Sequence, residues 1–378
     1  MGREAHRPCP VRPRRHAHLP DGRPFLQRQP GSRIPEGHMT VAIVRSTLDQ
    51  AADALAQALD LIAYKPTREA IFIKPNVPDY GPPGVGLFTD PAVVEGLLRY
   101  FAGRPIVIGE GAIVGRSAME AFRRTGYADL ARRYGAQLVD LNDAPRVEVE
   151  WEFGRIRLPA LLQTHEYVNV AKMKTHIQTG VTLGLKNQKG LLTEADKKRF
   201  HKIGLDRAIP ALARVAAPHL TVVDGIVGLE GLGPWRFGTP VDMGILVAGT
   251  DVVEVDNACL ELMGMPRERA PHIPPAPVHA VGVPIPEAAR PFVLDYPGYF
   301  RYHHVYEHVS DSCSGCNAAL YLAFRALRKS QWGRIRLLWS GQLRRTDIVL
   351  GSGVALPADH GRVLCVGDCA AAFARKGG

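Results

Sequence analysis

The sequence lacks an apolar run long enough to act as a signal peptide or to span a membrane, although 46% of its 378 residues are hydrophobic. We therefore expect a cytoplasmic protein without a membrane partner. Charged residues make up 22%, a share typical of soluble globular proteins, and the length suffices for one large core or two domains. The composition indicates no oligomeric state.

A general excess of positive charge over the folded part is also lacking. The formal net charge is +10, but residues 1–38 hold eight Arg against three acidic residues, so half of the excess lies in this first segment. The segment is rich in Pro, Arg and His and cannot bury a core of its own. We interpret it either as a misassigned start, with Met39 opening the protein, or as a disordered basic tail that touches RNA or a membrane.

Aromatic residues are missing where RNA binding would need them. Residues 172–190 contain four lysines but no Phe, Tyr or Trp on which bases could stack. This absence argues against nucleic acid as a partner.

Cysteine is scarce, with six residues in the chain. Cys9 lies in the first segment, and Cys259 lies in an apolar helical pattern where we expect a core residue. The other four form a CxxC and a CxxxC pair, each at or just before a predicted helix N-terminus, which favours thiolates: Cys313, Cys316, Cys365 and Cys369. Four thiolates suit zinc or an iron–sulfur cluster, while a redox dithiol couple and reduced structural thiols remain alternatives.

Strand and helix signals alternate along the chain, which predicts a parallel sheet. Strand patterns occur at 41–45, 70–74, 105–109, 137–141, 220–223 and 244–248, and helical patterns at 48–61, 117–134 and 205–215. Asp90 or Thr89 can cap a helix that starts at Pro91. Residues 146–158 alternate charged and apolar side chains, which predicts an antiparallel excursion, and the glycine-rich residues 226–238 follow the strand pattern at 220–223.

We therefore predict an α/β fold with an open, mostly parallel sheet, helices on both of its faces, and a smaller C-terminal α/β unit that carries the cysteines. The stretch from Pro266 to Pro286 has too many prolines for regular structure and is the best candidate boundary. The predicted division is a first segment, 1–38, a main domain, 39–266, and a C-terminal unit, 267–378.

The most informative stretch runs from Tyr167 to Gly190. Its first half alternates as a strand does, which places on one face Val168, Val170, Lys172, Lys174 and His176. That face changes from apolar to cationic, which indicates a strand that leaves a core and delivers charges at its C-terminal end, where open parallel sheets bind ligands. Its second half spaces three glycines among further polar residues, a pattern that suits close backbone approach to an anion.

Other predicted strands also end in polar residues. We predict that an anionic small molecule, a carboxylate or a phosphate, is held by Lys74, Asn76, Lys172, Lys174, Lys186, Asn187 and Lys189. Candidate groups for moving a proton are His176, Glu110 and Asp224. A solvated basic loop without a ligand, and a simple turn role for Glu110, remain alternatives.

Two further clusters have a plainer interpretation. The charged run from Glu194 to Lys202 predicts a solvated helix face, with a lid over the lysine-rich loop as the alternative. The histidines His303, His304 and His308 predict a solvated surface, with metal ligation as the alternative.

The chain resembles the bacterial and archaeal family called domain of unknown function 362, over roughly residues 41 to 262. The resemblance rests on Lys74-Pro75-Asn76, Thr89-Asp90-Pro91, Gly109-Glu110, VNVAKMKTH, GLKNQKG, VVDGIVGLEG and GTDVVEVDNA in this order. It implies that these residues occupy family motif positions: Lys74, Asn76, Lys172, Lys174, His176, Lys186, Asn187, Lys189 and Asp224.

Members of that family often carry iron–sulfur cysteine clusters, so the resemblance favours a 4Fe-4S cluster over zinc. This chain differs in lacking a ferredoxin-type array of closely spaced cysteines, and relatives with a similar C-terminal unit continue to a further Gly-Cys-Pro-Pro segment. One hypothesis is a redox enzyme that binds an anionic molecule and receives electrons from a donor protein. The other is a non-catalytic anion-binding protein with a structural zinc; RNA binding comes third.

Overall fold

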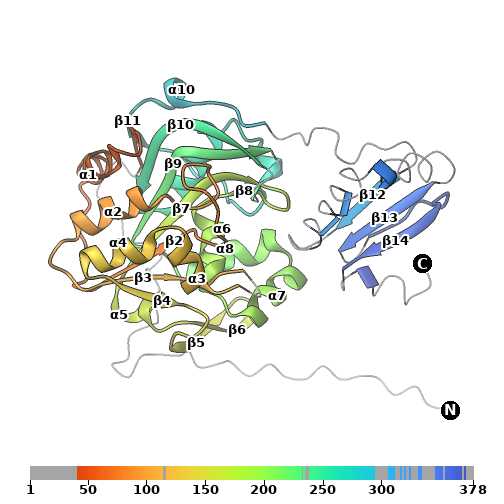
Figure 1. Cartoon of the computed structure of the whole chain (residues 1–378), viewed down its shortest axis with the longest axis horizontal. Helices are drawn as coiled ribbons and strands as arrows, with labels where there is room; N and C mark the ends of the chain where they lie inside the picture. The colour runs from red at the N-terminus through yellow and green to blue at the C-terminus, as the bar shows by residue number, and fades with distance from the viewer. Residues whose placement is uncertain are drawn as a thin grey trace, which may run out of the picture.

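The computed structural model describes residues 41–113, 116–231, 233–234, 238–293 and 305–310, together with 316, 319–320, 323–324, 331–333, 345–351, 354–367 and 370–371. The fold is α/β, as predicted: a large, mostly parallel sheet carries helices on both faces, and a small sheet follows towards the C-terminus (Figure 1).

The strands of the large sheet are β1 (Val41–Arg45), β2 (Ile71–Pro75), β3 (Ile106–Glu110), β4 (Gln137–Asp140), β7 (Glu166–His176), β8 (Gly180–Thr182), β9 (Leu220–Gly231), β10 (Gly238–Gly249) and β11 (Ala280–Gly282). Within the described residues their order is β11-β1-β10-β9-β7-β2-β3-β4, and β8 pairs with β7. The run β9-β7-β2-β3-β4 is parallel, whereas β10 is antiparallel to both of its neighbours. The C-terminal ends of β7, β2 and β3 therefore lie side by side at one edge.

Helices cover each face of the sheet over a separate hydrophobic core. One face carries α1 (Ala51–Leu61), α2 (Pro91–Tyr100), α3 (Ala118–Arg124) and α4 (Tyr127–Tyr134). The other carries α5 (Leu161–Thr164), α6 (Gly184–Asn187), α7 (Glu194–Ile203), α8 (Leu205–Val215), α9 (Val252–Leu262) and the antiparallel pair β5 (Arg146–Trp151) and β6 (Gly154–Pro159). Short elements complete the body: η1 (Gln188–Leu191), η2 (Arg267–Arg269) and α10 (Ile285–Ala288).

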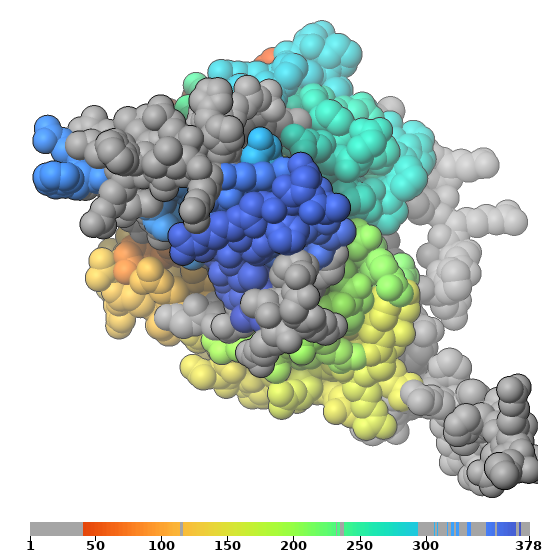
Figure 2. Space-filling model, turned by 90° about the vertical axis from the view of Figure 1, so that its right-hand side faces the viewer, coloured from red at the N-terminus to blue at the C-terminus, as the bar shows by residue number. Residues whose placement is uncertain are grey.

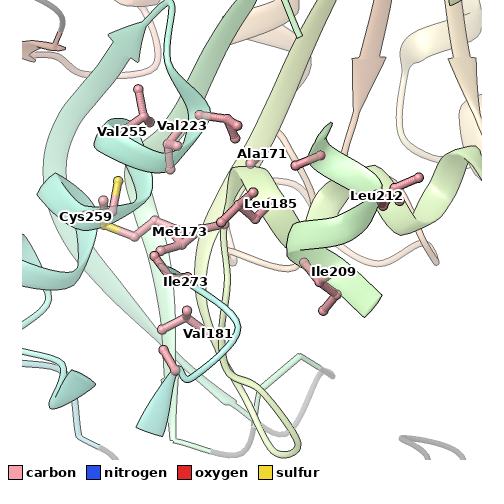
Figure 3. Packing of buried hydrophobic residues seen from close by; sticks show 14 of the residues in the cluster. Ala171, Met173, Val181, Leu185, Ile209, Leu212, Val223, Val255, Cys259 and Ile273 are labelled. Atoms are coloured by element: carbon pink, nitrogen blue, oxygen red, sulfur yellow. The ribbon is translucent and has the colours of Figure 1, made fainter. Parts of the chain in front are cut away.

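Strand β7 connects the two cores, and all of its residues are buried. Its alternation is the predicted one, because Val168 and Val170 pack in one core and Ala171 and Met173 in the other. Full burial of such a side chain stabilises the fold by about 1.5–3 kcal/mol. Figure 3 shows the second core, in which Ala171 and Met173 lie close to Leu185 of α6 and Cys259 of α9. Cys259 is thus the core residue that the sequence predicted.

Several local predictions are confirmed. Asp90 caps α2, since its side chain accepts a hydrogen bond from the Ala92 amide, and Pro91 occupies the first turn. The antiparallel excursion is the β5–β6 hairpin. Helix α8 has the predicted bounds, with Pro210 inside it.

Other local predictions were wrong or incomplete. The helical pattern at 117–134 is two helices, because Gly126 has a φ of 85° and separates α3 from α4. The strand predicted at 220–223 continues to Gly231 and pairs with β10 as an antiparallel hairpin, so the strand extends into the glycine-rich segment. The proline-rich segment forms β11, which pairs with β1, so residues up to Gly282 continue the large sheet.

The small sheet consists of three parallel strands, β12 (Val305–Ser310), β13 (Thr346–Gly351) and β14 (Arg362–Val366), in this order within the described residues. Its core contains Ile348 and Leu350 of β13 together with Leu320 and Phe324, and Cys316 packs against it. This sheet is the C-terminal unit that the sequence predicted. Figure 1 shows it on the side where α7 and β8 are labelled, and Figure 2, which looks from that side, shows its blue atoms in front.

Candidate functional site

A cavity of about 450 Å³ lies where β7, β2 and β3 end. Eight of the ten predicted ligand and catalytic residues line it: Lys74, Asn76, Glu110, Lys174, His176, Lys186, Asn187 and Lys189. They come from separate parts of the chain, and the parallel order of the three strands brings them to one edge. Leu87, Ala112 and Ile113 give the cavity an apolar wall.

A buried ion pair forms the floor of the cavity. Lys74 Nζ lies 2.9 Å from Glu110 Oε1, and both side chains are almost fully buried. Backbone amides of Val77 and Gly111 donate to the two Glu110 oxygens. Burial lowers the pKa of Lys74, and Glu110 counters part of that effect. Glu110 therefore holds Lys74 in place as a fixed cation.

Asn187 links the strand ends to the short helix α6. Its Oδ1 accepts from Lys74 Nζ at 3.2 Å and from Asn76 Nδ2 at 2.9 Å, and its Nδ2 donates to Asn169 Oδ1 at 2.8 Å. One amide thus connects β2, β7 and α6. This network orients Lys74 and Asn76 relative to each other.

The buried side chain of Asp256, from α9, caps the N-terminus of helix α6. Asp256 accepts from the amides of Gly184 and Leu185 at 2.7 and 2.8 Å, which satisfies donors that a helix start leaves open. Burial raises the pKa of Asp256 to about 7, against the two amide hydrogen bonds, which lower it. A Cβ at Gly184 would lie 2.9 Å from Asp256 Oδ1, so glycine permits this close approach. Lys186 and Asn187 are positioned as a result.

Gly190 completes the floor. A Cβ at this position would overlap Glu110 Oε1 and lie 2.5 Å from Lys74 Cε. The absence of a side chain therefore lets the loop after α6 cover the Lys74–Glu110 pair. The predicted close approach of this backbone to a bound anion stays a prediction.

Two of the predicted site residues lie outside the cavity lining. Lys172 and Asp224 form a buried ion pair with a distance of 2.7 Å between Nζ and Oδ2. Asp224 also accepts from the amides of Asp90 and Ile226. This pair ties β7 to β9 and to the start of α2.

Lys174, two residues further along β7, lines the cavity. Its side chain is 1% exposed, and its Nζ donates to the Leu87 carbonyl at 2.7 Å. Burial lowers its pKa to about 7, and the positive charge of Lys172 contributes in the same direction.

His176 ends β7 and is also buried in the cavity wall. The Gln178 amide donates to its Nδ1 at 3.1 Å, so the ring proton of the neutral form sits on Nε2. Burial lowers its pKa well below the usual value, and Lys186 and Lys189 add to this effect. Burial likewise lowers the pKa of Lys186, with help from Lys189 and Lys174. Nearby cations thus make each further positive charge costly.

Helix α7 supplies lining residues that the sequence analysis missed. Lys197 Nζ donates to the carbonyls of Gly111 and Ala112, and His201 Nε2 lies 3.4 Å from Lys189 Nζ. Burial lowers the pKa of His201 to about 3, with a contribution from Lys189. The charged run is therefore solvated only in part, since Glu194 and Lys202 are exposed while Lys197 and His201 face the cavity.

His272, in the proline-rich segment, is not one of the cavity-lining residues, but it lies close enough to His176 to act on the pKa of that ring, after burial and the nearby lysines. It is 1% exposed, and neither ring nitrogen has a hydrogen-bond partner among the described residues. Burial lowers its pKa to about 3, and Lys186 and Lys189 contribute. No sequence signal places it beside β7.

Three lining residues carry buried polar atoms that lack a partner within the described part of the chain. These atoms are Asn76 Oδ1, Asp79 Oδ1 and Thr182 Oγ1. Buried polar atoms are normally hydrogen-bonded, so each marks a place where a bound molecule or water would make a contact.

The cysteine prediction falls partly outside the described residues, which include Cys316 and Cys365 but not Cys313 or Cys369. Cys316 Sγ lies directly against Gly367, where a Cβ would overlap it. Gly367 lies between Cys365 and Cys369 in the sequence, so Cys316 lies against a residue of the CxxxC segment. In the described residues no group of three or more metal-ligating side chains is found.

The histidine patch is described only at His308. Its Nε2 lies 2.6 Å from Asp347 Oδ1, and Asp347 also pairs with Arg345. His303 and His304 lie outside the described residues. As for the membrane, no helix among the described residues combines the length and the apolar character that a crossing requires.

Comparison with known proteins gives two findings. The profile of a family described as a domain of unknown function (DUF362) matches residues 71–261, which is half of the chain and holds every predicted ligand and catalytic residue. The chain is also similar to the thylakoid-associated protein sll1697 of Synechocystis sp., with 26% identity over 275 residues, or 68% of this chain and 84% of that protein.

Proposed function

This chain belongs to the DUF362 family of domains of unknown function, and on the geometry of its cavity we propose that it binds a small anionic molecule there. The proposed ligand carries a carboxylate or a phosphate group. The observation that carries the proposal is the charge of the lining: among the described residues, six lysines line the cavity against two carboxylates, Asp79 and Glu110.

This excess of lysines over carboxylates raises the free energy of the folded protein when no ligand is bound. Glu110 is already paired with Lys74, so it does not neutralise the cations of α6 and α7. Like charges brought together in a buried site raise the free energy of the folded state; here burial first, and the neighbouring lysines in addition, lower the pKa values of Lys186 and Lys174. An anion between these side chains would relieve that repulsion, because it supplies the missing negative charge.

Specific contacts support a small, partly polar ligand. Neutral His176 would donate its Nε2 proton to the anion, while Lys186 and Lys189 would supply charge. Thr182 Oγ1 and Asn76 Oδ1 would then contact other polar atoms of the ligand. The apolar side chains of Leu87 and Ile113 leave room for a short carbon skeleton.

Thermal unfolding with added anions tests the proposal. Phosphate or citrate at saturating concentration and constant ionic strength should raise the melting temperature, whereas chloride should not. A ligand at about 100 times its Kd contributes about 2.7 kcal/mol to the stability.

A matched pair of variants separates the cavity from general charge effects. Lys189→Met should remove most of the phosphate increment, and Lys202→Met, on an exposed position of the adjoining helix, should keep it. Equal increments from chloride and phosphate in the unaltered protein would refute anion binding in the cavity.

The second proposal concerns the cysteines. Cys313, Cys316, Cys365 and Cys369 would together hold a metal cofactor, an iron–sulfur cluster rather than zinc. The contact of Cys316 Sγ with Gly367 favours a shared site. Because Gly367 has no Cβ, the sulfur of Cys316 lies directly against the backbone between Cys365 and Cys369. The thiolate donor set fits either metal group. A bound cluster would supply single electrons, and an electron-donor protein would then be a partner.

Absorption spectra test the cofactor directly. Protein purified without oxygen should be brown if a cluster is present, and metal analysis should find iron and sulfide; Cys316→Ser should lose both. Zinc without iron would support the alternative of a structural zinc site. A protein with neither metal would contradict the proposed site, and Cys259→Ser, in the core of the large sheet, is a control that should keep the cofactor.

A cytoplasmic location stays a prediction. The Synechocystis protein is named as thylakoid-associated, and that description applies to that protein. Fractionation of cells that produce this chain would test the prediction.

A further inference from the structure

Among the buried lysines near the strand ends, Lys174 has an unusual environment. Lys74 and Lys172 each lie within 3 Å of a carboxylate, Glu110 and Asp224 respectively. Lys174 Nζ instead donates to a neutral carbonyl, that of Leu87, and no ion pair of Lys174 occurs within the described residues. A buried ammonium without a counter-charge readily loses its proton.

The surroundings add to this effect. Lys172 precedes Lys174 on the same face of β7, and Lys74 stands on the neighbouring strand, so positive charges approach it from two sides. Glu110 is the one acidic side chain that acts against them, and it is committed to Lys74. A lysine that is desolvated and close to other cations is the arrangement that makes an amine nucleophilic at neutral pH.

We propose that Lys174 is a nucleophilic amine that forms a Schiff base with the carbonyl group of a small anionic oxo compound. The class includes short 2-oxo acids and phosphorylated aldehydes or ketones. This inference rests on the proposed anion site, because Lys186 and Lys189 would bind the acidic group of the same molecule.

The covalent step is balanced without another reagent. The neutral amine of Lys174 attacks the carbonyl carbon, a C–N bond forms, and the carbonyl electron pair moves to oxygen. The oxygen then takes two protons and leaves as water, one proton coming from the attacking amine and one from solvent. The product is a protonated imine, whose positive charge stays on the lysine nitrogen. Nothing is oxidised or reduced.

The cavity offers a lysine for each of the two functional groups of such a compound: Lys174 for the carbonyl group and Lys186 for the acidic group. Lys174 lies at the end of β7, and Lys186 lies on α6, which packs against β7. Thr182 Oγ1, which lacks a partner within the described chain, would contact the departing oxygen or a substituent hydroxyl.

Reductive trapping tests the proposal on the full-length protein. Pyruvate or glyoxylate is added at pH 7.5 with sodium cyanoborohydride, which converts an imine to a stable secondary amine, and peptides are analysed by mass spectrometry. Lys174 should be modified at least about tenfold faster than exposed Lys202. Propanal, a carbonyl compound without an acidic group, should show a much smaller preference for Lys174.

Variants and competition make the outcome decisive. Lys174→Arg replaces the amine by a guanidinium that forms no imine, so it should abolish trapping at this site, whereas Lys202→Arg should leave the trapping of Lys174 unchanged. If Lys174→Arg does not fold, competition in the unaltered protein replaces it: phosphate should slow modification of Lys174 and leave Lys202 unaffected. Stabilisation by phosphate without preferred modification of Lys174 would overturn the Schiff-base proposal alone. Absence of both would overturn the anion site as well.

Discussion

Lys172 and Lys174 point to the same side of β7 and are buried equally, with 1% exposure each, yet their environments differ. Lys172 pairs with Asp224, which is itself fixed by two backbone amides. Lys174 meets a carbonyl and opens onto the cavity. The two lysines, two residues apart on one strand, thus have different roles. Lys172 stabilises the fold, whereas Lys174 is available to a ligand.

The comparison shows that burial of a lysine does not by itself indicate a function. A buried pair whose hydrogen bonds are complete contributes little net stability but is damaging to break. A buried lysine without a carboxylate raises the free energy of the folded state, and such a cost is a mark of functional sites. The predictions that follow test the difference between the two lysines.

The largest expected effect comes from breaking the structural pair. Asp224→Asn should reduce the free energy of unfolding by about 3–5 kcal/mol, because Lys172 is left buried without its counter-charge. Urea denaturation measures the loss. The double variant Lys172→Met/Asp224→Leu should recover most of it, and a single variant with less than about 1 kcal/mol of loss would show that the pair is not structural.

The second effect concerns the floor of the cavity. Gly190→Ala should cost about 1–3 kcal/mol and abolish phosphate binding, because the new Cβ displaces Glu110 and Lys74. Gly103→Ala is a useful control, since Gly103 has a φ of 84° and open space around its Cβ position. The control should lose some stability through backbone strain but bind phosphate normally. Normal phosphate binding by the Gly190→Ala variant would show that binding does not depend on the close packing of Gly190 against Lys74 and Glu110.

The third effect depends on pH. The pKa of Lys174 in the folded protein is lowered to about 7 from 10.5, so between these values the unfolded chain binds the extra proton. The stability cost of Lys174 is therefore complete below pH 7 and disappears as the pH rises towards 10.5. Lys174→Met should be more stable than the unaltered protein by about 2 kcal/mol near pH 7, and this advantage should shrink by pH 10. An advantage that does not change with pH would contradict the assignment.

The smallest of these effects is on affinity. Lys186→Met should weaken phosphate binding by about tenfold, or about 1.4 kcal/mol, and leave the unliganded protein at least as stable. Lys202→Met, at an exposed position, should leave binding unchanged. Equal losses in the two variants would mean that long-range charge, not the cavity, attracts the anion.

Site residues could be predicted from the sequence where a local pattern of residues determines the structure. The alternation of β7 identified the faces of Lys174 and His176, and the polar ends of β2 and β3 identified Lys74 and Glu110. These residues meet because neighbouring parallel strands end at the same edge, a rule that needs no knowledge of side-chain contacts.

The rest depends on tertiary contacts that no local pattern encodes. The charged run of α7 has the composition of a solvated helix, and only its docking turns Lys197 and His201 towards the cavity. His272 lies in a segment whose prolines indicate no element, although that segment adds β11 to the sheet. The separate roles of Lys172 and Lys174 likewise follow from the position of Asp224 on β9, since the two lysines are equivalent in the alternation.

Calorimetric titration of inorganic phosphate tests the central claim most directly, because it measures anion binding and the state of the cavity lysines together. At pH 7.5 and low ionic strength, phosphate should bind at one saturable site. The heat should differ between buffers of unequal ionisation enthalpy, because the anion draws a proton onto Lys186, whose pKa is lowered by burial and by the neighbouring lysines. Titration without saturable heat in any buffer would contradict the account.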